Sequence, residues 1–596
     1  MKRLKIARVV FPIGLGKEFD YLVPESMNLK KGMRVLVDFK NKKKVAIVVG
    51  FKRESLYPQL KPIKEILDRF PSLSEEKIKF AKNLSKIYPY TYGEFLFMML
   101  PPYLKKAKRL EASFLSKEGS GFKVSFVKAD SFLERYSFWK EKIKKKLKEG
   151  SVLIFFPQIS YLEEARKVIT LDFKEVEIIH RQQKEKEIFN NWLKSRRRSL
   201  ILSTRVGIFY YPEDLTLIVI EEENSLYYFQ EEKPFHHLVD VASILAKQKR
   251  IELILAADYP TISTYYLIKK KKIDLIDKSK KKKKELIKII DLGNYQKKRI
   301  INPLLGELLR KNIEEDKSCL ILWNKKGFST FVTCSVCGYI YKCQRCYSYL
   351  KFSFKEGKGV CPYCGKKTEI GQVCSKCKTG YIKMVGLGIE KLRMILKRYF
   401  PQTRIEEWEK RTSNAKIILS TSKILSSLYQ DSSFSVGFIL DIDSWLSRLN
   451  YEATFESFVY LKKLSYLFTD NLYVFTYNKN HYLFENINED WRKFYEKELS
   501  LRKKLKLSPF GIIAKITTRA KNENKLLEKM KNLYNKLKGR GLEVYGPFKE
   551  YPFKLRGKFR YSLIVKAKKG YFLRKVIKEE TAVYRSSHLK SAIVIK

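Results

Sequence analysis

Eight of the nine cysteines in this chain form four C-x-x-C pairs within one short segment. The pairs are Cys334/Cys337, Cys343/Cys346, Cys361/Cys364 and Cys374/Cys377. Two thiolate pairs of this spacing complete a tetrahedral zinc site, with zinc–sulfur distances of about 2.3 Å. Four pairs therefore predict two Zn²⁺ ions. Because protein sulfur fills every ligand position, we expect these ions to fold and position the segment and to catalyse no reaction.

The spacing between the pairs indicates which of them share an ion. The loop between Cys346 and Cys361 holds 14 residues, close to the roughly 15 to 20 residues between the knuckles of a zinc ribbon. This spacing favours a nested arrangement, with the inner two pairs on one ion and the outer two pairs on the other. Disulfides are disfavoured, because the chain is large and has no cleavable signal sequence. Cys319 has no partner motif and is expected to be a free buried thiol.

The length and composition predict a multidomain protein of the cytoplasm. The chain has 596 residues, of which 44% are hydrophobic, and a single core stops growing at about 250 to 300 residues. No stretch of 18 uncharged apolar residues occurs, and the first residues are too polar for a signal peptide. We therefore expect several domains and no membrane association.

The charge predicts a polyanionic partner. The formal net charge is +58, from 122 basic and 64 acidic residues, and 14% of the residues are aromatic. This excess suits nucleic acid or an anionic membrane surface. Its spread along the chain, together with the aromatic content, favours nucleic acid, because no basic amphipathic helix is evident. The lysine runs 269–272 and 280–284 are expected to be solvated loops.

The elements that must position these residues alternate in a regular way. Short apolar segments at 7–13, 18–24, 32–39 and 43–51 predict strands of a small sheet or barrel, followed by a helix over Ser74–Met99 that ends before Pro101. From about 122 to 273, and again from about 289, strands and helices alternate as in a parallel sheet covered by helices. The last ninety residues predict an α+β domain. The fold class is therefore α/β multidomain.

Long motifs on both sides of the cysteines resemble those of the PriA family of bacterial replication restart proteins, also called primosomal protein N′. They include NKKGFSTFVTCSVCG, MVGLGIEKLRMILKRYFP, FDYLVPESMNLKKGMRVLVDF, KLSPFGIIAKI and YGPFKEYPFKLRGKFRYSLIVK. The resemblance covers most of the chain. It implies two zinc ions in the nested pairing.

The resemblance also implies a division into domains. A DNA 3′-end-binding domain would occupy residues 1–102, and a basic linker, 103–121, would stand where the family has a winged helix. Two RecA-like helicase lobes would span 122–275 and 276–507, with a zinc module at 334–378 inserted in the second. A C-terminal α+β domain would occupy 508–596.

The helicase motor departs from the family pattern. PriA resembles superfamily-two helicases, whose phosphate loop, G-x-x-x-x-G-K-T, holds the ATP phosphates and magnesium. Here the corresponding segment is SFVKADSFLERY. Ser131 stands in place of the second glycine, Phe132 of the lysine and Leu133 of the threonine. A phenylalanine cannot neutralise a triphosphate, so ATP loses its main binding groups.

The remaining motor motifs also lack residues that the family uses for ATP hydrolysis. The acidic box reads Glu221–Asn224, and the coupling motif reads Ala257–Pro260. Where the family has two arginines that stabilise the transferring phosphate, Tyr460, Lys463 and Tyr466 occur. Arginine fingers contribute about 10³ to 10⁵ in rate. We therefore expect no ATP hydrolysis and assign no catalytic residue. The acids Glu221, Glu222 and Glu223 are expected to form a solvent-exposed strand end, with magnesium binding as the less favoured alternative.

The DNA-facing motifs are better preserved. Phe19, Asp20 and Tyr21 match the family's F-D-Y, in which the aspartate accepts a hydrogen bond from the terminal 3′ hydroxyl, and Lys61 matches a basic residue of the same pocket. The alternative is that these are ordinary strand and turn residues.

A second DNA-facing motif follows a strand of the first lobe. Thr204 and Arg205 match the family's G-T-R strand-contact motif, and phosphate contacts are plausible there. Alternatively, Arg205 pairs with an acid across the lobe.

These features predict a PriA-like primosomal protein without ATPase activity. It would bind stalled or branched fork DNA, 3′ ends and single strands. By resemblance, its partners would be primosome proteins, single-stranded DNA-binding protein and the loader of the replicative helicase. Two alternatives stay open: an active ATP-dependent 3′-to-5′ helicase, and a zinc-containing scaffold that binds structured RNA.

Overall fold

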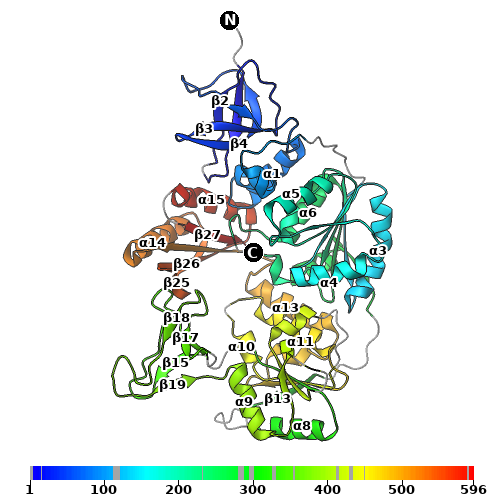
Figure 1. The fold of residues 1–596 in the computed structure, drawn as a ribbon, viewed down its shortest axis with the longest axis vertical. Coiled ribbons are helices and arrows are strands. Elements are labelled where there is room, and N and C mark those ends of the chain that lie inside the picture. The colour runs from blue at the N-terminus through cyan, green and yellow to red at the C-terminus, as the bar shows by residue number, and fades with distance from the viewer. Residues whose placement is uncertain are drawn as a thin grey trace.

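The fold contains two parallel sheets covered by helices, one at the middle right and one at the bottom of the view in Figure 1. An antiparallel sheet from the N-terminal part of the chain lies at the top, and another from the C-terminal part lies beside the first parallel-sheet lobe. The computed structural model describes residues 5–14, 16–111, 121–230, 232–279, 287–293, 301–324, 331–353, 356–410, 412, 415–427, 434–448, 450–586 and 590–595. The predicted α/β multidomain class is confirmed. The lysine run 280–284 and residues 112–120 of the predicted linker lie outside the described residues.

The N-terminal sheet is antiparallel, in the order β2-β1-β4-β3-β5. Its strands are β1 (Ile6–Val10), β2 (Phe19–Leu22), β3 (Arg34–Phe39), β4 (Lys42–Lys52) and β5 (Glu65–Ile66). Lys40 and Asn41 join β3 to β4 with φ angles of 51° and 58°. Positive φ at both central positions matches a tight type I′ hairpin turn.

The helix predicted over Ser74–Met99 is in fact two helices, α1 (Glu75–Ile87) and α2 (Tyr92–Met98), followed by the short 3₁₀ helix η1 (Pro102–Lys105). Thr91 begins α2 with a capping box, in which its hydroxyl accepts from the Glu94 N–H and the Glu94 carboxylate accepts from the Thr91 N–H. The prediction of one helix was wrong because Pro89 cannot continue the helical hydrogen bonding.

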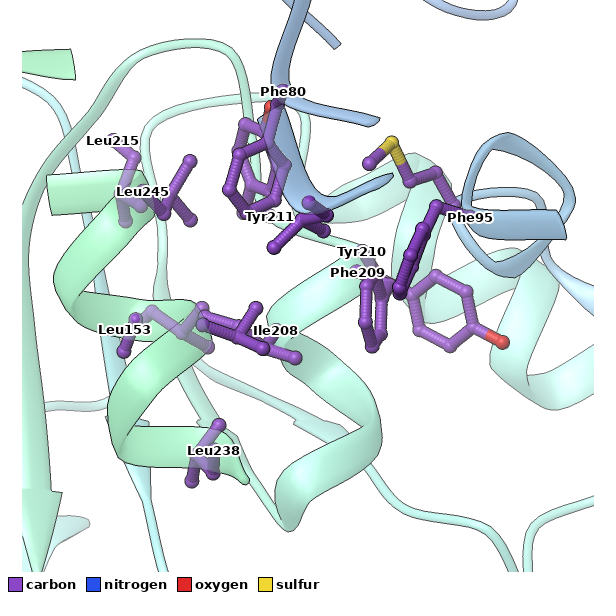
Figure 2. Close-up of a cluster of buried hydrophobic side chains, with 14 of the residues drawn as sticks. Phe80, Phe95, Leu153, Ile208, Phe209, Tyr210, Tyr211, Leu215, Leu238 and Leu245 are labelled. Atoms are coloured by element: carbon purple, nitrogen blue, oxygen red, sulfur yellow. The ribbon is translucent and has the colours of Figure 1, made fainter. Parts of the chain in front are cut away.

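Both helices share a core with the first parallel-sheet domain (Figure 2). The ring of Phe80 in α1 lies 5.8 Å from that of Tyr211, and Phe95 in α2 stacks 6.3 Å from Phe209. A buried ion pair joins Lys77 of α1 to Glu213 of the lobe at 3.1 Å. The N-terminal strands are therefore anchored to the first lobe through α1 and α2.

The first lobe contains a seven-stranded parallel sheet in the order β12-β6-β11-β10-β7-β9-β8. Every residue of the central strand β10 is buried. The strands are β6 (Lys123–Lys128), β7 (Ser151–Phe155), β8 (Val176–Ile179), β9 (Leu200–Ser203), β10 (Leu215–Glu221), β11 (Glu252–Ala257) and β12 (Asp274–Asp277). The helices are α3 (Phe132–Leu147), α4 (Ile159–Ile169), α5 (Glu185–Lys194), η2 (Arg205–Phe209), η3 (Leu226–Tyr228), α6 (Leu238–Lys249) and α7 (Ile262–Lys269).

The second lobe contains a six-stranded parallel sheet in the order β13-β23-β22-β14-β21-β20. The strands are β13 (Ile287–Asp291), β14 (Cys319–Leu322), β20 (Ile405–Glu407), β21 (Ile417–Ser420), β22 (Val436–Ile439) and β23 (Leu472–Thr476). The helices are α8 (Pro303–Glu314), α9 (Ile389–Tyr399), η4 (Trp408–Lys410), η5 (Ser422–Ser427), α10 (Asp443–Leu446), α11 (Ala453–Ser465), α12 (Tyr482–Asn486) and α13 (Trp491–Lys504). Cys319 is buried in β14, and burial raises the pKa of its thiol to about 12, as expected for a free structural cysteine.

The cysteine segment leaves the second lobe after β14 and returns at α9, projecting to one side below the C-terminal domain (Figure 1). Its strands are β15 (Phe331–Cys334), β16 (Lys351–Ser353), β17 (Lys358–Val360), β18 (Lys367–Glu369) and β19 (Ile382–Val385).

The C-terminal domain has an antiparallel sheet in the order β25-β26-β24-β27. Its elements are β24 (Ile512–Ala520), α14 (Glu523–Gly539), β25 (Glu543–Leu555), β26 (Lys558–Ala567), α15 (Gly570–Ser586) and β27 (Lys590–Ile595). The sequence pattern missed β27, which pairs with β24. Across the described parts of the chain, no helix combines the length and apolar character needed to span a membrane.

Candidate functional site

The eight paired cysteines gather into two clusters, and in each cluster the four sulfur atoms lie within 4.8 Å of one another. One cluster contains Cys334, Cys337, Cys374 and Cys377, and the other contains Cys343, Cys346, Cys361 and Cys364. Sulfur atoms of facing pairs are 3.6, 3.8 and 3.7 Å apart for 334–377, 337–374 and 343–364. A tetrahedral ion with metal–sulfur distances of about 2.3 Å requires sulfur atoms about 3.8 Å apart. The structure thus has the predicted nested pairing and fits a four-thiolate metal in each cluster.

The backbone around the cysteines is shaped for these clusters. The residue after each C-x-x-C pair has a positive φ, namely Gly338 (66°), Tyr347 (53°), Gly365 (69°) and Lys378 (58°). In the first turn, the N–H groups of Val336 and Cys337 each donate to the Cys334 sulfur over 3.4 Å. A Cβ added at Gly380 would lie 2.3 Å from that sulfur, so only glycine fits there.

The segment in place of the phosphate loop is the turn between β6 and α3. Ser131 caps α3: its hydroxyl accepts from the Glu134 N–H at 3.3 Å, and the Glu134 carboxylate accepts from the Ser131 N–H at 3.2 Å. Phe132 is 3% exposed and packs with Tyr136, Trp139 and Phe156. Two N–H groups at this helix start, those of Ser131 and Glu134, are therefore bonded to the protein's own side chains and not available to a phosphate.

Arg135 lies one turn further along α3, pointing at the acidic strand end of β10. Its guanidinium donates to Glu221 at 2.9 Å, to Glu222 at 2.8 Å and to the Ala129 carbonyl at 2.7 Å. Arg135 is 2% exposed, and Glu221, Glu222 and Glu223 are 0%, 6% and 1% exposed. The expectation that these acids form a solvent-exposed strand end was wrong, because Arg135 pairs with Glu221 and Glu222 and the Thr261 N–H donates to Glu223 in the interior.

Lys463, on α11 of the second lobe, completes this network from the other side. Its ammonium group forms an ion pair with Glu222 and lies 3.5 Å from the Asp258 carboxylate. Three residues further along, the Tyr466 hydroxyl donates to Asp130 at 3.2 Å. Positions where the family has phosphate-stabilising arginines therefore connect the two lobes directly. We call Arg135, Glu221, Glu222, Asp258 and Lys463 the interlobe ion network.

Burial and charge act in opposite directions on the acids of this network. Burial raises the pKa of Glu221 to about 7 against the opposing charge of Arg135. Burial would also raise the pKa of Glu222, but the charges of Lys463 and Arg135 together lower it below its ordinary value. Glu222 therefore carries the negative charge that pairs with both cations. Sequence reasoning did not predict that Arg135 and Lys463 both pair with Glu222, because the two residues are 328 positions apart in the chain.

The predicted 3′-end residues lie along β2 and beside its end. Asp20 accepts from the Ser55 hydroxyl at 2.6 Å and forms an ion pair with Lys52. Lys61 is exposed, and its carbonyl accepts from the Leu22 N–H at 3.0 Å, which places it next to β2. Asp20 and Lys61 are thus brought to the same edge, and their contact with DNA stays a prediction.

The two aromatic residues of the same motif face the domain interior. Tyr21 is 5% exposed, and its hydroxyl donates to the Asp38 carbonyl at 2.8 Å. The Phe19 ring lies 5.4 Å from Phe11 and 5.1 Å from Phe39. Tyr21 therefore supports the pocket from within.

A cavity of about 790 Å³ in the N-terminal domain is lined in part by Phe11 and Phe39. Lysines from the β3–β4 hairpin line it, namely Lys40, Lys42 and Lys44, together with Lys105 and Lys233. Sequence reasoning overlooked this basic cavity. The sequence feature that could have predicted this cavity is the group of lysines at the β3–β4 turn, directly after Phe39 at the end of β3.

Thr204 lies between β9 and η2, and Arg205 is the first residue of η2. Thr204 is 9% exposed, so little of its side chain reaches solvent. The Arg205 guanidinium donates to the Gln230 side chain at 2.8 Å and to the Tyr227 carbonyl at 2.9 Å. These bonds tie η2 to the loop after β10, and the predicted phosphate contact stays a prediction.

Two family models match the ends of the chain. Residues 8–101 match the 3′ DNA-binding domain of PriA, and residues 503–595 match the primosomal protein N C-terminal domain. The replication restart protein PriA of Rickettsia felis is 24% identical, with 96% of each chain covered. The chain is therefore similar to PriA replication restart proteins at both ends and over nearly its whole length.

Other PriA sequences show the same similarity. The Haemophilus influenzae PriA is 21% identical over 97% of each chain, and the Thermotoga maritima PriA is 26% identical over 70% of this chain and 60% of the relative. Among solved structures, RecG bound to a three-way DNA junction has a TM-score of 0.33 at 9% identity, covering 72% of this chain and 46% of that chain. A similarity this low supports no argument about the motor.

Proposed function

We propose that this protein belongs to the PriA family, binds stalled or branched replication forks and recruits primosome components that reload the replicative helicase, without hydrolysing ATP. The interlobe ion network is the observation that supports the proposed absence of ATP hydrolysis. Arg135 and Lys463 pair with the acids that would hold magnesium, and Ser131 and Glu134 cap the helix that would hold phosphate. An active helicase would need ATP to displace all of these groups.

DNA binding is supported by the match to a 3′ DNA-binding domain and by the net charge of +58. We assign the strand end to the β2 edge, where Asp20 accepts from the terminal 3′ hydroxyl and Lys61 attracts the last phosphate. Phe19 and Tyr21 support this edge, and Thr204 and Arg205 contact the strand as it crosses the first lobe.

Zinc is the metal we assign to both thiol clusters, because Zn²⁺ suits tetrahedral four-thiolate coordination. Four filled positions leave no place for a reacting water, so the zinc module serves as a rigid surface for primosome proteins. By similarity to the family we propose single-stranded DNA-binding protein and the helicase loader as partners, and the cytoplasm as the compartment.

Structure-selective binding tests this proposal. Labelled forked DNA should bind more tightly than single-stranded DNA of equal length, with no change on adding ATP, and structured RNA should compete poorly. An Asp20→Asn variant should lose the preference for a fork ending in a 3′ hydroxyl over one ending in a 3′ phosphate. Equal affinity for forked and single-stranded DNA would contradict the proposal, and RNA that outcompetes forks would favour an RNA-binding scaffold.

A further inference from the structure

A cavity of about 790 Å³ lies between the two lobes, beside the interlobe ion network. Residues that follow β7 and β10 form its first-lobe wall, and residues that follow β14, β20, β21 and β22 form its second-lobe wall. Ligands of open parallel sheets bind outside the carboxyl ends of the strands, and cavities of about 300 to 1,000 Å³ hold small ligands. This cavity therefore has the place and size of a ligand site.

Aromatic rings from both lobes line the cavity. Tyr161 contributes from α4, Trp408 from η4, Trp445 from α10 and Tyr460 from α11. The ring centroids of Trp445 and Tyr460 lie 3.8 Å apart with the ring planes inclined by 45°, so they form one aromatic surface with a bend between the rings. Aromatic side chains bind planar ligands by stacking on a ring face.

The charge of the lining excludes a nucleoside triphosphate. Four acids line the cavity, Glu164, Glu222, Glu409 and Glu456, against two bases, Arg448 and Lys463. Both bases already face carboxylates: Arg448 lies 2.9 Å from Glu456, and Lys463 pairs with Glu222. Four negative and two positive charges leave a net charge of −2 in a chain of +58. The lining therefore favours an uncharged planar group that donates hydrogen bonds.

Glu164 supplies the acceptor for such a group. Its Oε2 atom is buried and makes no hydrogen bond to any described part of the protein. Burial raises the pKa of this carboxyl, which indicates that its charge is poorly compensated. A buried polar atom without a partner calls for a ligand or water.

We propose that the interlobe cavity takes an unpaired base of the bound DNA strand, with guanine preferred. Guanine presents two adjacent donors, N1–H and N2–H, that one carboxylate accepts together, whereas thymine presents one. The base would stack on the aromatic surface and bond to Glu164, while its phosphates stay outside on the basic exterior. A cationic peptide is disfavoured, because the net charge of the protein repels it at long range. This inference rests on the proposed DNA binding.

The experiment compares forks whose single-stranded arm is all thymidine with forks carrying one guanosine in that arm, at each position in turn. A bidentate contact to a base discriminates by about 5- to 150-fold. We expect at least one guanosine position to tighten binding by about fivefold or more, and the preference to fall below about twofold in Glu164→Gln. Glu163→Gln is the matched control, because Glu163 is the preceding residue of α4, half-exposed and paired with Arg166 at 3.5 Å.

Each other outcome is decisive. Tight fork binding with no guanosine preference at any position would overturn the inference and leave the proposed function intact. A preference that persists in Glu164→Gln would overturn the role of this cavity. Displacement of the fork arm by arginine amide and not by free guanosine would assign the cavity to a protein side chain instead. Absence of any DNA binding would remove both the proposed function and the inference.

Discussion

Arg135 is a buried cation beside the acidic end of β10, one turn after Phe132, which stands at the expected position of the phosphate-loop lysine. It bonds to Glu221 and Glu222 and to the Ala129 carbonyl, so its removal would take the paired cation from Glu221 and leave Glu222 with Lys463 alone. Breaking a buried ion pair by removing one partner costs about 3 to 5 kcal/mol. We expect Arg135→Met to lower the free energy of unfolding of the first lobe by this amount, as measured by chemical denaturation.

An exposed arginine provides the control. Arg166 pairs with Glu163 on the surface of α4, with half of its side chain exposed. Surface pairs contribute about 0 to 1 kcal/mol, so Arg166→Met should have a small effect. Equal losses for the two variants would show that the interlobe ion network does not stabilise the lobe.

Glu223 predicts that the free energy of unfolding falls as the pH rises, whereas an acid in an ordinary ion pair makes it rise. Burial raises its pKa to about 7, although the Thr261 N–H donates to its carboxylate at 2.6 Å. The folded protein therefore holds this proton more tightly than the unfolded chain, whose pKa is about 4.3. Its contribution to stability is present below about pH 4 and is lost as the pH rises to 7.

The Glu223→Gln variant tests this sign. Between pH 5 and 8, the free energy of unfolding of its first lobe should fall by less than that of the unmodified protein, with a difference of at most about 3 kcal/mol. Denaturation at both pH values measures it. A steeper fall in the variant would contradict the assignment of a raised pKa.

At the scale of elements, the inner thiol cluster anchors the C-terminal domain. The hairpin of β25 and β26 lies against it: Tyr551 contacts Tyr349 and Tyr363 at ring distances of 6.4 and 5.9 Å. At the hairpin tip, the Gly557 N–H donates to the Arg345 carbonyl, between Cys343 and Cys346, at 3.1 Å. The fold of the inner cluster therefore sets the position of this hairpin.

Loss of the inner metal should release the hairpin. In Cys361→Ser, we expect hydrogen exchange in residues 545–560 to accelerate about tenfold or more, because the residues that hold the hairpin depend on the metal for their fold. Cys374→Ser, in the outer cluster, is the matched control and should leave these amides unchanged. Acceleration in both variants to the same extent would show that the hairpin does not depend on the inner cluster in particular.

Local patterns in the sequence predicted most helices and strands, and long-range packing accounts for the features that these patterns missed. The nested cysteine pairing and both parallel sheets follow from short-range spacing and apolar runs. The helix break at Pro89 could have been predicted from the sequence, but the apolar pattern on both sides of Pro89 favoured one continuous helix. The burial of Glu222 could not be predicted from the local sequence, because one of its two ion-pair partners, Lys463, lies more than two hundred positions away.

At the scale of the whole molecule, the lobes are connected where a motor must open and close. The Tyr161 hydroxyl donates to the Leu425 carbonyl at 2.6 Å, and the Tyr495 hydroxyl donates to the Pro260 carbonyl at 2.5 Å. The ion pair of Lys463 and Glu222 and the hydrogen bond from Tyr466 to Asp130 join the lobes as well. We therefore expect a fixed DNA-binding platform, with its basic surface, thiol clusters and 3′-end edge held in one arrangement.

Phosphate release from ATP in the presence of forked DNA tests this account most directly. The intact protein, loaded with zinc and saturated with fork, should release phosphate no faster than a protein-free blank. Arg135→Met and Lys463→Met should behave in the same way, because no phosphate loop remains to hold the nucleotide. Turnover of about 1 s⁻¹ or faster, stimulated by forked DNA and abolished in Glu222→Gln, would contradict it.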